Sequence, residues 1–501
     1  MSRKKNQKKT NKKLNIISKL TATCTIIGSC LFVFVLVSMG ILPSKYLMMI
    51  IGLLSVTSLL FGVIAFHKGV NKFNKIIQSA ICTVLAFLLM VSSIGIEIYK
   101  DKIRNIFTNT ETITLYVYTL KDSSIKTIDD LANHSIGLST FTNQEVQDAA
   151  IADITTYFSK YELGSVETNT FSGIFKVVDA LFNHEVDSIM VQENMIDILE
   201  ELDEYKDFDQ KVKAIYESTH KVTIKRSDAS FVLKNITKDP FVVAVGGRDY
   251  NEHFDVNMVV TVNPVTKQVL IVTVPRDAYS PLDGDKEKMD KLSYTGKLGS
   301  DVWLKTLQLF FDYDFNFFGI VDFYSIGDVI DAIGGIDIYN PYFFTAPSFL
   351  QGKKKYYFYE GDLHLDGMGT LAYCRERQSL AHGDLSRNEH QGIVLKALIK
   401  KITSPDIINK ADTVLNALED KITTDFTPEL IYKLVNMQIK DNAEWNIVTY
   451  NISGELFYTY SYMIGHEYGP NYAMMDLNQN DLKKANDMIR QVLDGETPIK
   501  N

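Results

Sequence analysis

Arginine is scarce in most of this chain: eight arginines follow Lys100 in about 400 residues. Five of them fall in four short motifs, and each motif carries a carboxylate beside or near its arginine: Gly247-Arg248-Asp249, Pro275-Arg276-Asp277, Arg375-Glu376-Arg377 and Asp384-Leu385-Ser386-Arg387. A guanidinium group binds phosphate oxygens through a planar fork of donors and stays charged, while carboxylates are the usual ligands of Mg²⁺. One such motif alone is more typical of a structural ion pair. All four together favour a metal-assisted phosphate or diphosphate site.

Cysteine is also scarce. Cys24, Cys30 and Cys82 lie in long apolar runs, and Cys374 is the remaining one. This excludes a disulfide framework for the rest of the chain. Cys374 ends an apolar segment before Arg375, so we expect a small core residue there and not a nucleophile.

Acidic residues are missing from Met1–Leu20, which holds eight basic residues. Three apolar runs follow, Leu20–Leu42, Tyr46–Phe66 and Ile76–Ile98, each near the roughly 20 residues that a membrane-spanning helix needs. The basic start should remain in the cytoplasm, so three crossings predict that the chain after Lys100 lies outside. A secretory signal peptide would need only one apolar run.

The charge is unevenly divided. The whole chain carries −9, and residues 1–100 hold 13 basic residues and one acidic residue, so they carry +12 and the remainder carries −21. Such an acidic segment disfavours nucleic acid as a partner, and an anionic substrate would have to bind at a local cluster of the scarce arginines.

Alternating patterns divide the outer part into two α/β regions. The pattern predicts strands at Thr112–Tyr118, Ser135–Leu138 and Val186–Val191, and helices at Ser124–Leu131 and Phe175–Phe182. A polar stretch, His220–Pro240, follows. We therefore expect a basic cytoplasmic segment at 1–19, three membrane helices in 20–100, an accessory α/β domain at 105–235 and a larger domain at 240–501.

The larger domain carries the motifs at the ends of its predicted elements. Strands are expected at Phe241–Val245, Val256–Val262 and Gln268–Val274, and helices at Val302–Phe311, Ile326–Ile333 and Arg387–Ile402. Arg276 directly follows a strand. Asp384 and Arg387 open a helix, where backbone N–H groups favour anions. Arg375 and Arg377 are expected on one face of a further strand, with Glu376 turned away. The aromatic segment Tyr313–Phe318 reads as packed core.

The order of these motifs resembles the LytR-CpsA-Psr (LCP) family, in particular capsule-type members with three membrane helices and an accessory domain. The resemblance is strongest from Phe241 to Ser404. Besides the four arginine motifs, it rests on Asp255-Val256-Asn257, Thr261-Val262-Asn263-Pro264, Asp290-Lys291-Leu292, Gly334-Gly335-Ile336-Asp337 and Gln391. It implies an α/β LCP domain with a central mixed sheet flanked by helices.

The resemblance also implies a function. Family members move a glycan polymer, capsular or teichoic-acid-like, from an undecaprenyl-pyrophosphate carrier onto peptidoglycan of Gram-positive walls through a phosphodiester bond. Asp249 and Asp255 match the family's acids for Mg²⁺ or Mn²⁺. The pyrophosphate-binding positions match Arg276, Arg375, Arg377, Arg387 and Gln391, and the catalytic ones Arg276, Asp384 and Arg387. The membrane and capsule assembly proteins would be further partners.

Two family arginines are replaced here, by His253 and His390, and Phe254 stands where the family usually has Ser or Thr. Neutral histidines would weaken pyrophosphate binding. Two other functions remain open: a non-catalytic membrane-anchored regulator or assembly factor that binds lipid-linked glycan, and a polyprenyl-pyrophosphate hydrolase. A polyprenyl chain needs an apolar channel, which we expect the helices at Val302–Phe311 and Ile326–Ile333 to line.

Overall fold

The computed structural model describes residues 2–39, 42, 44–67, 69–106, 108–226, 235–322, 324–347, 355–404, 416–418 and 421–499. The chain forms two compact units, Met1–Phe107 with Phe426–Ala443, and Thr108–Asp425 with Glu444–Asn501. Part of the polar stretch His220–Pro240, residues 227–234, lies outside the described residues.

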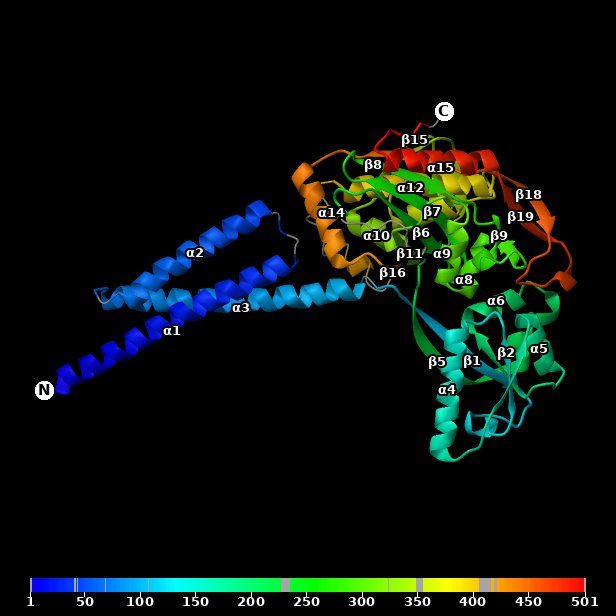
Figure 1. Ribbon diagram of the computed structural model, residues 1–501, viewed down its shortest axis with the longest axis horizontal. Helices are drawn as coiled ribbons and strands as arrows, with labels where there is room; N and C mark the ends of the chain where they lie inside the picture. Colours follow the sequence, from blue (N-terminus) through cyan, green and yellow to red (C-terminus); the bar gives the residue numbers. More distant parts are fainter. Residues whose placement is uncertain are drawn as a thin grey trace. The chain divides into compact units, whose positions relative to one another are not determined.

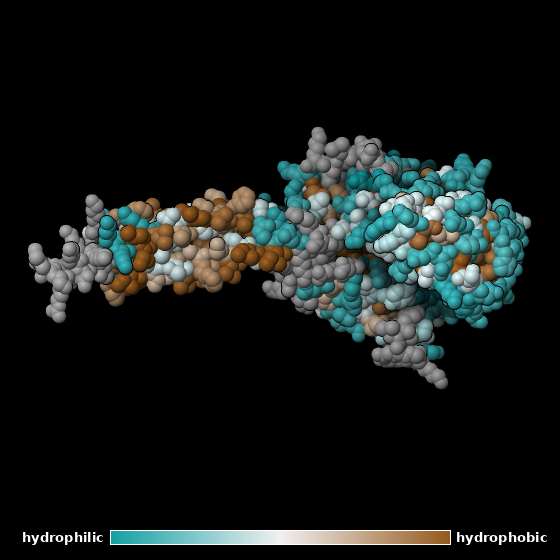
Figure 2. Space-filling view, turned by 90° about the horizontal axis from the view of Figure 1, so that it is seen from below, coloured by the Kyte–Doolittle hydropathy of each residue, from teal (hydrophilic) through white to brown (hydrophobic). Residues whose placement is uncertain are grey.

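The first unit contains three long helices, α1 (Ser2–Met39), α2 (Ser44–Phe66) and α3 (Lys72–Ile106), and the shorter α14 (Pro428–Asp441). The spans Lys12–Ser38, Lys45–Phe66 and Lys72–Ile98 are long and apolar enough to cross a membrane, which confirms the three expected runs. Apolar side chains cover much of their surface (Figure 2). Inside the pair of α1 and α3, Ser18 donates to Gln78 at 2.5 Å and Thr25 to the Cys82 carbonyl at 3.0 Å. These two hydrogen bonds satisfy polar side chains within the spans, as an apolar environment favours.

The second unit begins with a part that we call the accessory domain, which is built on a five-stranded sheet of order β3-β2-β4-β1-β5. Figure 1 labels β1, β2 and β5 of this sheet. Its strands are β1 (Thr110–Leu120), β2 (Ser135–Ser139), β3 (Glu167–Phe171), β4 (Ser188–Gln192) and β5 (Val212–Thr223). Its helices include α4 (Gln144–Tyr161), α5 (Ile174–Phe182), α6 (Ile196–Leu199) and α7 (Phe208–Lys211), with 3-10 turns η1 (Asp129–Leu131), η2 (Glu193–Met195) and η3 (Asp203–Tyr205).

The strands that the sequence predicts in the accessory domain are confirmed, and so is the helix predicted at Phe175–Phe182, which is α5. The helix expected at Ser124–Leu131 is wrong, because only the turn η1 forms there. The side chain of Asp130 accepts from the backbone of Lys126 and Thr127 and so holds this segment in a loop.

The following domain is centred on a six-stranded mixed sheet of order β16-β11-β6-β7-β8-β17. The strands are β6 (Phe241–Arg248), β7 (Phe254–Asn263), β8 (Gln268–Thr273), β11 (Phe317–Asp322), β16 (Ile422–Thr424) and β17 (Asn446–Asn451). β6, β7 and β8 form an antiparallel meander, while β11 and β17 join it in parallel. The mixed sheet and the three strands expected in Phe241–Val274 are confirmed.

Helices cover both faces of this sheet. One face packs against α9 (Ser300–Gln308) and α15 (Gln479–Leu493), and their apolar side chains share a core with Leu270 and Val272 of β8. The other face carries α12 (Asp384–Ile402), whose Gly392 approaches Thr273 and Thr449. α10 (Ser325–Ile333), α11 (Gly367–Arg375) and α12 enclose a separate apolar cluster. The sheet is thus the middle of three layers.

Short elements complete this domain. They are β9 (Tyr279–Pro281), η4 (Leu282–Gly284), β10 (Met289–Lys291), η5 (Leu292–Tyr294), α8 (Thr295–Leu298), β12 (Ile336–Asn340), β13 (Phe344–Pro347), β14 (Lys355–Phe358), β15 (Gly361–Leu365), β18 (Gly454–Thr459), η7 (His466–Tyr468) and β19 (Tyr472–Leu477). The aromatic segment Tyr313–Phe318 is packed core as expected, since Phe315 and Phe318 are each 1% exposed.

The packing of α9 shows that part of the expected lipid channel is wrong. Trp303 of α9 is fully buried and stacks on Phe254 with ring centroids 4.2 Å apart. Even a Cβ atom added at Gly246 would lie within 3 Å of both rings. α9 therefore closes directly on the sheet, because the segment that looked like a channel wall has a bulky aromatic on its inner face.

Candidate active site

Asp249 and Asp255 lie at the same end of the β6–β7 hairpin. Arg248 and Phe254 are cross-strand partners there, so the two acids flank the connecting turn. Asp249 Oδ1 accepts from the backbone N–H groups of Asn251 at 3.0 Å and His253 at 2.8 Å, and Asp249 Oδ2 lies 3.4 Å from His253 Nδ1. Burial opposes ionisation of Asp249, but the His253 side chain and these amides lower its pKa below the usual value. Asp249 is therefore held as a carboxylate.

Arg276 links the second of these acids to the loop after β8. Its Nη1 donates to Asp255 Oδ1, and its Nε lies 3.6 Å from Asp277 Oδ1. Lys291 Nζ lies 3.7 Å from the same Asp277 oxygen. Burial alone would lower the pKa of the guanidinium, but Asp255, Asp277 and Asp384 together raise it. Arg276 therefore remains positively charged, and it lies shortly after the end of β8.

Asp384 and Arg387 form the first turn of α12, as the sequence predicts. Arg387 Nη2 donates to Asp384 Oδ1, and the two side chains are only 5% and 12% exposed. Burial raises the pKa of Asp384, an effect that Arg387 opposes and Asp277 reinforces. Burial likewise lowers the pKa of Arg387, with Asp384 opposing. The electrostatic influence of Arg276, Asp255 and Asp277 on this pair shows that β7, the loop after β8 and α12 bring their charges together.

The resulting group, which we call the charge cluster, consists of Asp255, Arg276, Asp277, Asp384 and Arg387. Among the described residues, several of its buried polar atoms have no hydrogen-bond partner: Arg276 Nε, Asp277 Oδ1, Asp384 Oδ2 and Arg387 Nε. Buried polar atoms are nearly always paired in folded proteins. Two guanidinium N–H groups without an acceptor are the arrangement that an anionic ligand would complete.

Arg375 and Arg377 do not lie on a strand, which corrects the sequence prediction. Arg375 is the last residue of the helix α11, because the apolar run before it packs as a buried helix and not as an extended segment. Its guanidinium carbon lies 4.7 Å from the ring centre of Tyr324. Arg377 is exposed, and no described contact joins its side chain to the charge cluster. Glu376 is structural as expected, since it is 6% exposed and accepts from the Ser379 backbone at 2.7 Å.

Gln391 and Cys374 join α12 to α11. Gln391 is 5% exposed and its Nε2 lies 3.5 Å from the Cys374 carbonyl oxygen. Burial raises the pKa of the Cys374 thiol to about 12. Cys374 is therefore an inert core residue, as the sequence indicates.

The two histidines at family arginine positions have different surroundings. His390 is fully buried, and its ring stacks on Tyr373 at 4.2 Å and Phe344 at 4.7 Å. Burial lowers the pKa of His390 to about 4, so it is neutral near pH 7. His253 instead lies at the site, against Asp249. One of the two histidines is thus part of the aromatic core, whereas the other lies beside a candidate metal ligand.

The two candidate ligands, Asp249 and Asp255, suit a metal ion whose remaining ligands come from the substrate and water. Among the described residues no group of three or more His, Cys, Asp or Glu side chains is arranged to hold a metal ion. Asp249 and Asp255 supply two carboxylates, and Mg²⁺ is commonly bound by one or two carboxylates together with phosphate oxygens and water. Both residues fit that mode of binding.

Two acids of the sequence motifs, Asp277 and Asp290, have structural surroundings that the sequence analysis did not predict. Asp277 belongs to the charge cluster, and its position beside Arg276 was the available signal. Asp290 is fully buried and accepts from Ser461 Oγ at 2.6 Å and the Met463 N–H at 2.8 Å. Burial raises the pKa of Asp290 to about 6. A single acid between Met289 and Lys291 gives no sign of that burial.

Comparisons with known proteins show which proteins this chain is similar to. The chain is 32% identical over 201 residues to the polyisoprenyl-teichoic acid–peptidoglycan teichoic acid transferase TagV of Bacillus subtilis strain 168, covering 38% of this chain and 51% of TagV. It is 30% identical over 221 residues to TagU of Bacillus licheniformis, a transferase of the same description, covering 43% of this chain and 68% of TagU. The chain thus spans about half the length of the first of these curated relatives and about two thirds of the second.

A crystal structure of Bacillus subtilis TagV aligns with 52% of this chain and 99% of that chain at 28% identity; its TM-score of 0.43 is too low for a detailed comparison. The sequence profile of the LytR_cpsA_psr family matches residues 205–487. That match covers more than half of the chain and contains every residue of the charge cluster. The chain therefore belongs to the LytR_cpsA_psr family.

Proposed function

We propose that this protein is a phosphotransferase that moves a glycan polymer from an undecaprenyl-pyrophosphate carrier onto peptidoglycan. The polymer would be a capsular polysaccharide or a teichoic-acid-like chain. Membership of the family supports this proposal, as do relatives that are named polyisoprenyl-teichoic acid–peptidoglycan teichoic acid transferases.

One observation carries the proposal: in the charge cluster the buried atoms Arg276 Nε, Arg387 Nε and Asp384 Oδ2 have no hydrogen-bond partner among the described residues. Transfer of a glycosyl phosphate from a diphosphate requires that the charge on the phosphate oxygens be neutralised while a hydroxyl group attacks. Arg276 and Arg387 offer N–H groups at one place for this purpose. Arg276 Nε lies 3.6 Å from Asp277 Oδ1, which is an ion pair but too long for a hydrogen bond, so this N–H group still has no hydrogen-bond acceptor among the described residues.

The roles of the residues follow from their positions. Arg276 Nε and Arg387 Nε would hold the pyrophosphate, and Asp249 and Asp255 would hold Mg²⁺ or Mn²⁺, which supplies further charge neutralisation when bound. Asp384 Oδ2 would accept the proton of the attacking wall hydroxyl. Its raised pKa suits a base, because a carboxylate that holds a proton more strongly removes one more readily. The new bond is a phosphodiester, and the leaving group is the polyprenyl monophosphate.

The lipid would lie against the apolar cluster of α10, α11 and α12. That cluster has a buried centre, which includes Ile330 and Leu371, and partly buried apolar side chains around it, including Val256, Ile326 and Ile393. Each buried CH₂ group contributes roughly 0.8 kcal/mol, so a polyprenyl chain gains most where partly exposed apolar side chains can be covered. Val256 directly follows Asp255, so this surface begins beside the charge cluster.

The membrane anchor supports an outward-facing site. The three candidate spans follow a basic N-terminus, and an odd number of crossings would place Thr108 and the rest of the second unit outside the membrane. Peptidoglycan and its lipid-linked donors lie on the outer side of the membrane.

The test is reconstitution of the full chain in liposomes with a synthetic polyprenyl-pyrophosphate disaccharide and Mg²⁺. The transferase releases polyprenyl monophosphate and attaches the disaccharide phosphate to added peptidoglycan. Release at the same rate without peptidoglycan would instead identify a hydrolase. Donor binding without release under any condition would identify a regulator or assembly factor. Asp384→Asn should remove release, whereas Asp487→Asn on the exposed face of α15 is the matched control and should not.

A further inference from the structure

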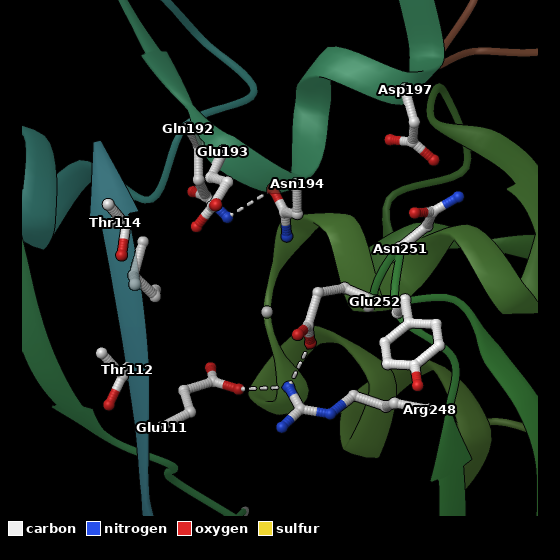
Figure 3. A pocket seen from close by; sticks show the side chains of 14 residues that line it. Glu111, Thr112, Thr114, Gln192, Glu193, Asn194, Asp197, Arg248, Asn251 and Glu252 are labelled. Carbon is white, nitrogen blue, oxygen red and sulfur yellow. Dashed lines mark hydrogen bonds and ion pairs between the residues drawn. The ribbon is translucent and has the colours of Figure 1, made fainter. Parts of the chain in front are cut away.

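A polar cavity of about 270 Å³ lies inside the second unit, where the accessory domain meets the mixed-sheet domain. Figure 3 shows side chains from both domains around it, with Arg248 and Glu252 on one side and Gln192, Glu193 and Asn194 on the other. The lining comes from four short segments: Glu111–Thr114 of β1, Gln192–Asn194 with Asp197, Arg248 with Tyr250–Glu252, and Gly296 with Gly299.

The walls of the cavity are fixed relative to each other. The apolar core of α5 continues into the mixed-sheet domain through Leu282, Tyr294, Met463 and Ile464. Lys297, whose side chain is fully buried, donates to Asp197 and, at 2.5 Å, to the Asn194 carbonyl across the same boundary. A cavity held by a shared core and a buried ion pair is already formed before a ligand arrives.

Polar groups built into the walls also cross this boundary. Glu111 of β1 accepts from Ser300 Oγ at 2.5 Å, and Arg248 Nη1 donates to it at 3.2 Å. Arg248 Nη1 also lies 2.6 Å from Glu252 Oε2 (Figure 3). The guanidinium is thus held between two carboxylates and is not offered to an anion.

The lining favours a neutral ligand that is rich in hydroxyl groups. It contains four carboxylates and a single guanidinium, a formal charge of −3, so phosphate groups are repelled. Carboxylate and amide groups from Glu193, Asn194 and Asn251, with the hydroxyls of Thr112 and Thr114, can accept from or donate to sugar hydroxyls. The volume is near the lower end of the range for small-molecule sites, roughly 300 Å³, and so suits a single sugar residue.

The cavity borders the candidate active site. Arg248, which lines it, precedes Asp249 in the chain. Tyr250, also in the lining and 73% exposed, stacks on Tyr324 with ring centroids 4.1 Å apart and an interplanar angle of 18°. The guanidinium carbon of Arg375 lies 4.7 Å from the ring centre of the same Tyr324. A line of stacked groups therefore runs from the acidic cavity to Arg375, an arginine of the sequence motifs.

We infer that this cavity is a saccharide subsite: it binds one neutral sugar residue of the glycan substrates while the pyrophosphate occupies the neighbouring charge cluster. The acidic cavity favours the uncharged sugar end of such a ligand, and the arginines favour its anionic pyrophosphate end. This inference rests on the proposed function for the identity of the substrate. The sugar could belong to the lipid-linked donor or to the wall acceptor, and both offer the same hydroxyl chemistry.

The experiment measures equilibrium binding and transfer separately, with the full chain in detergent. The variants are Glu193→Ala, which removes an exposed carboxylate of the lining, and Tyr250→Ala, which removes the exposed ring. Glu185→Ala is the matched control, because Glu185 is an exposed acid of the same domain outside the cavity. The probes are a polyprenyl pyrophosphate with and without a neutral disaccharide, and a neutral N-acetylhexosamine oligosaccharide as a model of the wall glycan.

Each lining variant should weaken binding about tenfold or more for the sugar-bearing probe, the loss expected for one charge-assisted hydrogen bond or one stacking contact. Binding of the sugar-free lipid should not change. Weakened binding of the lipid-linked disaccharide assigns the cavity to the donor, and weakened binding of the free oligosaccharide assigns it to the acceptor. If both variants bind every probe as the control does, the inference is overturned even if transfer is normal. If the wild type binds sugar in this way but transfers nothing, the subsite stands and the proposed function fails.

Discussion

Replacement of Arg276 by lysine tests the charge cluster most directly. Arg276 Nη1 donates to Asp255, and its buried Nε has no hydrogen-bond partner among the described residues. Lysine keeps the positive charge next to Asp255 but has a single ammonium group in place of the planar fork. The donor that we assign to the pyrophosphate is therefore lost, while the charge balance of the cluster is kept.

The expected effect on catalysis is larger than the effect on folding. A hydrogen bond to a charged group is worth roughly 1.5 to 3 kcal/mol, which corresponds to a loss of about 10- to 150-fold in kcat/KM. The free energy of unfolding should fall by only about 1 kcal/mol, since Asp255 still faces a cation and the Arg276 side chain is 21% exposed. A variant that fails only in catalysis separates substrate binding from structural pairing.

The assay is release of polyprenyl monophosphate from a lipid-diphosphate donor, at several donor concentrations. Arg490→Lys is the matched control, because Arg490 also pairs with a nearby aspartate, Asp487, but on the exposed surface of α15. It should retain wild-type kcat/KM. If Arg276→Lys matches this control, the guanidinium fork does not hold the pyrophosphate, and the reasoning from unpaired donors is refuted.

Three further predictions concern topology, metal and pH. Protease added to intact protoplasts should digest residues 101–501, and full protection of this region would reverse the topology. Asp249→Ala should abolish Mg²⁺-dependent diphosphate cleavage, and equal wild-type activity in chelator and in Mg²⁺ would remove the metal assignment. Because burial raises the pKa of Asp290 to about 6, the folded state retains a proton that the unfolded state has released above about pH 4. The free energy of unfolding should therefore fall by up to about 3 kcal/mol as the pH rises from about 4 to about 6. Thermal unfolding of Asp290→Asn, followed by tryptophan fluorescence, should lack this part of the pH dependence; a profile parallel to that of the wild type would contradict it.

The sequence by itself determined the elements whose signal is local. The three membrane spans follow from the length of their apolar runs, and β6 to β8 follow from strand patterns broken by the turn at Asn263–Thr266. The position of Arg387 in the first turn of α12 also follows from the chain. Each of these depends on neighbours within about 20 residues, so periodicity and length are sufficient to find them.

Other features depended on contacts between distant segments, and only the tertiary structure decided them. Arg375 ends a helix and not a strand, because a short apolar run fits either element until its neighbours are known. His390 is a neutral core residue, since Tyr373 and Phe344 remove water from around it. The tight contact of α9 with the sheet depends on Phe254, which lies 49 residues from Trp303 in the chain.

The same distinction applies to the site. The motif residues could be named from the sequence because they recur in order, and their charges identified them as candidates for binding phosphate and metal. Their burial, the pairing of Asp255 with Arg276 and of Asp384 with Arg387, and the polar atoms left without partners arise only when β7, the loop after β8 and α12 meet. The cavity between the two domains has no sequence signal at all, because its lining comes from successive segments that are about 45 to 80 residues apart and acquire a common chemistry only by packing together.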